Sequence, residues 1–121
     1  MNTIQQCAIL LWANRTFPGN TDIEYYGKLV WYAHQKGWLY IAKENGDVSA
    51  CGIAYRVPDK SKATCDALPE ESEGEILYCT CVASRSNKRF TIRKLLRAAK
   101  KRNEAAKVLM FHRLGGRNGK E

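Results

Sequence analysis

The sequence has 121 residues, of which 45% are apolar and 26% are charged. This length and composition exclude wholesale disorder and predict one domain over residues 1–114, followed by a flexible tail at 115–121. The formal net charge of +8 is unevenly distributed. Residues 1–84 contain 7 Lys+Arg and 10 Asp+Glu, whereas residues 85–121 contain 13 Lys+Arg and 2 Asp+Glu. The basic C-terminal third predicts an anionic partner.

No apolar stretch is long enough to span a bilayer, and the longest apolar run, residues 7–13, has no basic residue before it. We therefore expect no membrane partner, a cytoplasmic location, and five cysteines that stay reduced. Cys79 and Cys81 form the only close pair, at a spacing that predicts one face of one strand. We interpret them as buried apolar residues, and we expect no metal site.

Two helices are expected first. Residues 3–14 carry apolar side chains at helical spacing, with Thr3 and Gln6 as a capping box. After the break at residues 17–20, a second helix is predicted to begin at Thr21 and to end at Gly37. The first helix should bury Trp12 together with its other apolar side chains at helical spacing. The stripe of the second is Ile23, Tyr26, Gly27, Val30, Trp31 and His34.

A hairpin follows, because Asn45-Gly46 supplies the positive φ angles of a type I′ turn between runs 38–44 and 47–56. This turn predicts that Tyr40 faces Cys51, with Leu39 opposite Gly52 and Ile41 opposite Ala50. A polar connection at 58–75 leads to a strand at 76–83 that is apolar on both faces.

The last elements are a helix over residues 88–106 and a strand over 107–113. The predicted order is therefore α-α-β-β-β-α-β, an α/β fold with helices packed on a mixed sheet.

This order resembles the fold of the GNAT N-acetyltransferases over about residues 3–113. Residues 39–54 look like the second and third strands of the family with their turn, and 75–83 look like the fourth. Residues 84–106 look like the cofactor turn and helix, and 107–113 look like the fifth strand. The resemblance implies an acetyl-CoA cofactor and an acyltransferase activity.

The cofactor turn of the family reads Arg/Gln-x-x-Gly-x-Gly/Ala, and here the aligned residues run from Arg85 to Phe90. Lys88 and Phe90 stand where glycines would let a pyrophosphate approach the backbone, which predicts weakened or lost catalysis. The resemblance implies cofactor contacts from Val82, Ala83, Arg85, Ser86, Asn87, Lys88 and Arg89.

A transferase also needs a base for the acceptor amine. By position, the candidates are Glu75 at the start of the fourth strand and Tyr78 within it. His34 and His112 are interpreted as structural residues, because no carboxylate is grouped with either in the sequence.

A different function remains open for the same segment. From Arg85 to Arg102 there are nine basic residues and no acidic one. Like charges three or four residues apart repel on a helix, so the pattern also favours a non-enzymatic protein that binds nucleic acid or an acidic protein. The fold also occurs in bacteriophages, which would allow an assembly or virion component. The residues expected to bind such a polyanion are Arg93, Lys94, Arg97, Lys100, Lys101 and Arg102.

Overall fold

The computed structural model describes residues 2–14, 16, 22–59, 68–85 and 89–111. Its elements follow the predicted order. They are α1 (Thr3–Ala13), α2 (Ile23–Lys36), β1 (Leu39–Glu44), β2 (Asp47–Val57), β3 (Ile76–Ser84), α3 (Arg89–Arg102) and β4 (Val108–Phe111). The predicted tail at 115–121 lies outside the described residues.

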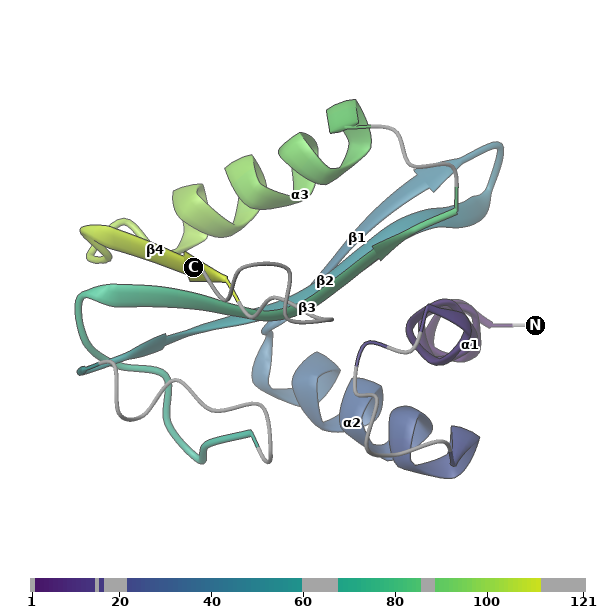
Figure 1. Ribbon diagram of the computed structural model, residues 1–121, viewed down its shortest axis with the longest axis horizontal. Helices are drawn as coiled ribbons and strands as arrows, with labels where there is room; N and C mark the ends of the chain where they lie inside the picture. Colours follow the sequence, from purple (N-terminus) through teal and green to yellow (C-terminus); the bar gives the residue numbers. More distant parts are fainter. Residues whose placement is uncertain (1, 15, 17–21, 60–67, 86–88, 112–121) are drawn as a thin grey trace.

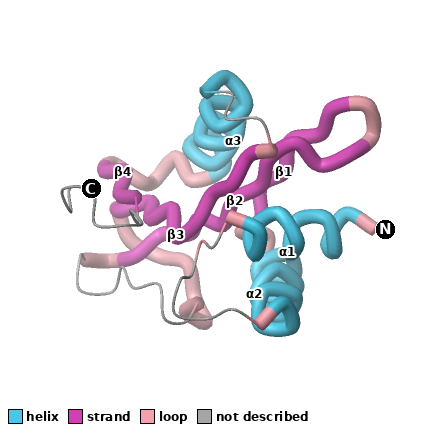
Figure 2. Tube along the Cα trace, turned by 45° about the vertical axis from the view of Figure 1, so that its right-hand side comes forward, coloured by secondary structure: helices cyan, strands magenta, loops and turns pink. Residues whose placement is uncertain are grey.

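The strands form one mixed sheet in the order β1-β2-β3-β4, in which β1, β2 and β3 are antiparallel and β4 is parallel to β3. Helices α1 and α2 cover one face of the sheet, and α3 covers the other (Figure 1). The tube view in Figure 2 shows the same three layers, with α3 opposite α1 and α2. The predicted α/β class is confirmed.

Each face of the sheet has its own core. Leu11, Tyr26 and Val30 from α1 and α2 pack with Tyr55 and Tyr78 on one face. On the other face, residues of α3 pack against all three antiparallel strands, with Tyr40, Ala50, Ala54, Leu77, Cys79, Leu95 and Ala99 buried. The strands β2 and β3 are therefore buried on both sides, as predicted for β3.

The N-cap of the first helix lies one residue before the predicted N-cap, Thr3. Asn2 is the N-cap: its side chain accepts from the Gln5 backbone N–H at 2.8 Å, and the Gln5 side chain accepts from the Asn2 N–H at 3.2 Å. Gln6 is used elsewhere, since its side-chain oxygen accepts from the Val48 N–H at 2.8 Å. The Thr3 and Gln6 capping box was therefore wrong.

The second helix is capped by Asp22, whose side chain accepts from the Glu24 N–H, and Thr21 lies outside the described residues. It ends at Gly37 with φ 79°, as predicted. The buried face of this helix is displaced by one residue from the predicted stripe. Tyr26, Leu29, Val30 and Ala33 are buried, whereas His34 is exposed. Trp12, Ile23 and Trp31 are also exposed rather than part of the core.

The hairpin turn is confirmed, with φ 54° at Asn45 and 85° at Gly46. Its register was wrong by one residue over most of β1: Leu39 pairs with Ile53, Tyr40 with Gly52 and Ile41 with Cys51. The cause is an irregularity in which Ala42 pairs with Ala50 but Lys43 with Val48, leaving Ser49 as an extra residue in β2. The Ser49 hydroxyl donates to the Ala42 carbonyl at 3.1 Å.

A second bulge lies in β3. Ile53 pairs with Cys81 and Ala54 with Cys79, so Thr80 is the extra residue. Consequently Cys79 belongs to the core under α3 and Cys81 to the core under α1 and α2. The prediction that both cysteines share one face was wrong, because the bulge changes the alternation of side chains between them.

The third helix ends at Arg102, four residues before the predicted end. The Asn103 side chain donates to the Ala99 carbonyl at 2.7 Å and to the Tyr40 hydroxyl at 3.0 Å, which closes the helix and ties its end to β1. The described part of the last strand, Val108–Phe111, lies inside the predicted 107–113, and residues 112 and 113 lie outside the described residues.

Candidate functional site

The junction between β3 and α3 is the first candidate. The Arg85 N–H donates to the Ser49 carbonyl at 2.8 Å, so the bulge in β2 anchors the chain where it leaves the sheet. Arg85 is exposed and borders a groove of about 280 Å³ with Gln6, Leu10 and Val48. Of the other predicted cofactor residues, Val82 packs on the α3 side and Ala83 on the α1 and α2 side.

The centre of the predicted turn, Ser86, Asn87 and Lys88, lies outside the described residues, as do the side chains of Arg89 and Phe90. Helix α3 begins at Arg89 with no acidic residue in its first turn. A helix N-terminus carries a partial positive charge, so the basic residues beside it add to a field that attracts anions. The junction can therefore hold a phosphate or another anionic group.

The exposed face of α3 is strongly basic. The helix contains seven basic residues and no acidic one. Thr91, Leu95 and Ala99 face the sheet and are buried. All six residues predicted to bind a polyanion are exposed: Arg93, Lys94, Arg97, Lys100, Lys101 and Arg102. Arg102 differs from the others, because its guanidinium packs against Gly37, where a Cβ atom would lie 2.7 Å from Nη2.

The two predicted catalytic residues have different surroundings. The Glu75 carboxylate forms an ion pair with Lys107 at 3.3 Å, and both side chains are exposed. Tyr78 is buried, and its ring stacks on Tyr55 with centroids 5.8 Å apart. The Glu75 carboxylate is therefore open to solvent, whereas the Tyr78 ring is part of the core.

The described histidine, His34, lies on α2 rather than at the junction of β3 and α3. His34 is exposed on α2, with its ring centroid 6.0 Å from that of Trp31. His112 lies outside the described residues.

The described cysteines are buried free thiols, as predicted, and Cys65 lies outside the described residues. Burial raises the pKa of Cys79 to about 12, and burial also raises the pKa of Cys81. A hydrogen bond to Cys7 and burial raise the pKa of Cys51. These three thiols are therefore protonated at neutral pH and unsuited to act as nucleophiles. Within the described ranges, no group of three or more His, Cys, Asp or Glu could hold a metal ion.

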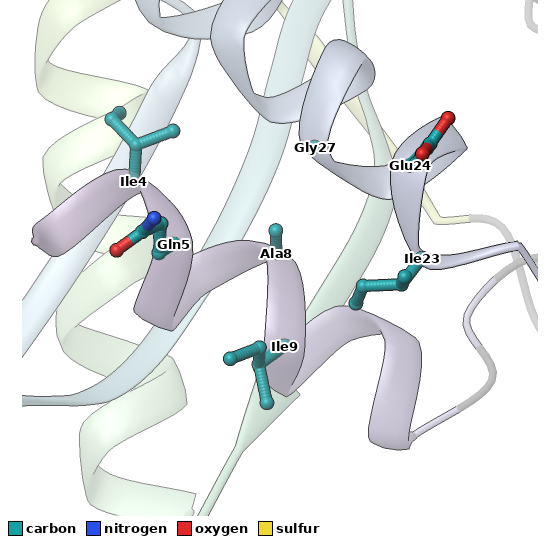
Figure 3. Close-up of a pocket in the computed structure, with 7 residues that line it drawn as sticks. All are labelled: Ile4, Gln5, Ala8, Ile9, Ile23, Glu24 and Gly27. Atoms are coloured by element: carbon teal, nitrogen blue, oxygen red, sulfur yellow. The ribbon is translucent and has the colours of Figure 1, made fainter. Parts of the chain in front are cut away.

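Sequence reasoning missed an apolar groove of about 570 Å³ between α1 and α2. Figure 3 shows the lining residues, with Ile9 on α1 and with Ile23 and Gly27 on α2. A Cβ atom at Gly27 would meet nothing within 4 Å, so this glycine leaves the groove wide. A glycine in the middle of a helix was the feature that could have indicated the groove. Among the described helices, none is long and apolar enough to cross a membrane.

Comparison with known proteins identifies the fold. No protein-family model matches the sequence, and a search of curated proteins finds no match. A solved structure, AAC(6')-Iy in complex with the bisubstrate analogue CoA-S-monomethyl-acetylneamine, superposes with a TM-score of 0.61 and 16% identity. The match covers 98% of this chain and 79% of that chain.

At 16% identity the likeness establishes the fold and leaves function to be argued from the residues. That neighbour is a GNAT acetyltransferase, and the order and layers of the elements agree with it. This chain has a GNAT-like fold, which confirms the resemblance drawn from the sequence.

Proposed function

We propose that this protein binds a coenzyme A thioester at the junction of β3 and α3, and that it is an N-acetyltransferase of weakened activity. The observation that carries the proposal is the exposed, anchored Arg85 between the end of β3 and a helix start without acidic residues. The structural neighbour was solved with a CoA bisubstrate analogue, which supports the same class of ligand.

Charge would compensate for the missing glycines of the turn. Coenzyme A carries phosphate groups, which a helix N-terminus and cationic side chains both attract. In the proposal, Arg85, Ser86, Asn87, Lys88 and Arg89 contact these phosphates. Val82 and Ala83, in the last part of β3, lie beside the arm that carries the thioester. Coenzyme A, when bound, supplies an acyl group activated as a thioester for attack by an amine.

For proton transfer, we assign the general base to Glu75 rather than Tyr78. The carboxylate of Glu75 is exposed and can accept a proton from an acceptor amine, whereas Tyr78 is buried against Tyr55.

Calorimetric titration of acetyl-CoA tests the binding proposal. We expect micromolar binding by the wild type and about tenfold weaker binding by Arg85→Ala, because a charge-assisted contact is lost. The matched control is Lys28→Ala, which removes an exposed positive charge on α2 and should bind as the wild type does. No binding at millimolar acetyl-CoA, or an equal loss in both variants, would contradict the proposal.

A second candidate function is the binding of nucleic acid without sequence preference. It is favoured by the exposed basic face of α3, where Arg93, Arg97 and Lys101 recur every four residues and so lie on one side of the helix. Phosphates spaced along a nucleic acid would neutralise such a column.

Fluorescence anisotropy with an arbitrary DNA duplex, measured at two salt concentrations, tests this candidate. The double variant Arg93→Glu and Arg97→Glu should bind at least about tenfold more weakly, with a shallower salt dependence, because phosphate contacts are lost. Lys28→Glu with Lys43→Glu is the control, since it makes the same charge change on α2 and β1. Binding that is absent or insensitive to salt would exclude the candidate.

A further inference from the structure

The helices α1 and α2 expose apolar side chains on the outside of their layer. Among the described residues, five large apolar side chains are exposed, and four of them lie on these two helices: Ile9, Trp12, Ile23 and Trp31. Ile9 and Ile23 also line the groove of about 570 Å³ between the helices. Exposed apolar side chains gathered on one layer are typical of a protein–protein interface, where tryptophan is enriched.

The charge of this layer favours a second copy of the chain as the partner. Helix α1 contains no charged residue, whereas α3, on the other face of the sheet, contains seven basic residues and no acidic one (Figure 1). Two copies of a chain with a net charge of +8 repel each other wherever their basic surfaces meet. An approach through α1 and α2 keeps the two basic helices on the far sides of the pair.

A glycine in the middle of α2 has no role in the packing of the chain itself. Gly27 does not adopt a positive φ angle, and a Cβ atom there would meet nothing within 4 Å. Glycine destabilises the interior of a helix relative to alanine, so this position carries a cost that the described packing does not explain. A helix surface without a side chain allows a second helix to approach closely.

The exposed face of α2 is complementary to itself. Glu24, Gly27, Lys28 and Trp31 recur at spacings of three and four residues, so they share one side of the helix, and the side chains of Glu24, Lys28 and Trp31 are exposed. Glu24 and Gly27 both lie at the groove (Figure 3). If two such faces pack antiparallel about a twofold axis, each contact occurs twice, and Glu24 of each copy lies beside Lys28 of the other.

We propose that two copies of this protein form a twofold-symmetric dimer through α2, with the two Gly27 residues close to the axis. In the dimer the Trp31 side chain of each copy packs on the other copy, and two Glu24–Lys28 ion pairs fix the antiparallel orientation. The inference is independent of the proposed coenzyme A site, because neither Arg85 nor the exposed face of α3 belongs to this surface. Changes at Lys28 therefore weaken the dimer and leave ligand binding at those sites unchanged.

Sedimentation velocity at increasing protein concentration tests the dimer. The wild type should pass from monomer to dimer, and Glu24→Lys and Lys28→Glu should each dimerise about tenfold more weakly, because both ion pairs become contacts between like charges. An equimolar mixture of these two variants should dimerise about as strongly as the wild type, since each variant supplies the charge that the other lacks. An effect confined to one helix would not be reversed by mixing.

Two further variants separate the interface from the stability of the fold. Gly27→Leu fills the open space on α2 and should weaken the dimer by at least about tenfold, because the second helix can no longer approach. The midpoint temperature of this variant at dilute, monomeric concentration should equal or exceed that of the wild type, since leucine favours the helix. Val108→Ala is the control: it removes an exposed apolar side chain on β4 and should dimerise as the wild type does.

A wild type that stays monomeric at millimolar protein would overturn the inference. So would a mixture of Glu24→Lys and Lys28→Glu that dimerises no better than either variant alone, or a Gly27→Leu variant that dimerises as strongly as the wild type. None of these outcomes bears on acetyl-CoA binding, so a failure of the dimer is distinguishable from a failure of the proposed function.

Discussion

Helices α2 and α3 are both 14 residues long and both end in a basic last turn, yet their first turns differ in charge. In α2, Asp22 caps the first turn, Glu24 lies within it, and His34 and Lys36 lie in the last turn. This arrangement matches the helix dipole at both ends. In α3 the first turn has no acidic residue, and basic residues continue to Arg102.

The contrast separates a helix stabilised by its own sequence from one that is not. The charges of α2 support its helix without any partner, so α2 serves as scaffold. The charges of α3 repel one another and oppose the dipole at its start, so α3 depends on the burial of Leu95 and Ala99 for its stability. An anion bound at the start or along the exposed face of α3 would remove that repulsion.

Removing the cap of α2 should give the larger stability effect. Asp22→Ala deletes the side chain that accepts from the Glu24 N–H at 3.0 Å. We expect a loss of about 1 kcal/mol in the free energy of unfolding, measured by urea denaturation. Glu44→Ala is the control, because it removes an exposed carboxylate at the end of β1 instead. Equal stability of Asp22→Ala and the control would show that the cap of α2 contributes nothing.

Reversing a charge should have a smaller effect, of opposite sign in the two helices. Arg93→Glu places an acid four residues before Arg97 and should raise the free energy of unfolding by a few tenths of a kcal/mol. Lys28→Glu places an acid four residues after Glu24 in α2 and should lower the free energy of unfolding by a similar amount. Both effects on the free energy of unfolding should decrease at high salt, because salt screens the charges. A loss of stability in Arg93→Glu would indicate that the basic face of α3 is part of the scaffold.

Local features, which depend on residues close together in the chain, could be predicted from the sequence. The element order follows from apolar spacing, and the hairpin follows from Asn45 and Gly46, whose residue types favour the positive φ angles of a type I′ turn. The two bulges, at Ser49 and Thr80, could not be predicted, because the residue pattern of a strand does not determine where its pairing shifts. Each bulge changes the alternation of side chains, and this is why the hairpin register and the shared face of Cys79 and Cys81 were wrong.

The candidate site likewise combines features that the sequence indicated with features that only the structure revealed. The basic residues from Arg85 to Arg102 are visible as a charge pattern, and the structure places those it describes on the outside of α3 and at its start. The exposure of Trp12 and Trp31 was missed because helical spacing gives a stripe but not the angle at which the helix lies on the sheet.

The most direct test of the central claim is an amide chemical-shift titration of the isotope-labelled protein with acetyl-CoA. The proposed function predicts that the largest shifts fall on residues 79–85 and on the first two turns of α3. Shifts concentrated on Ile9 and Gly27 in the groove between α1 and α2, or no shifts at millimolar ligand, would contradict it.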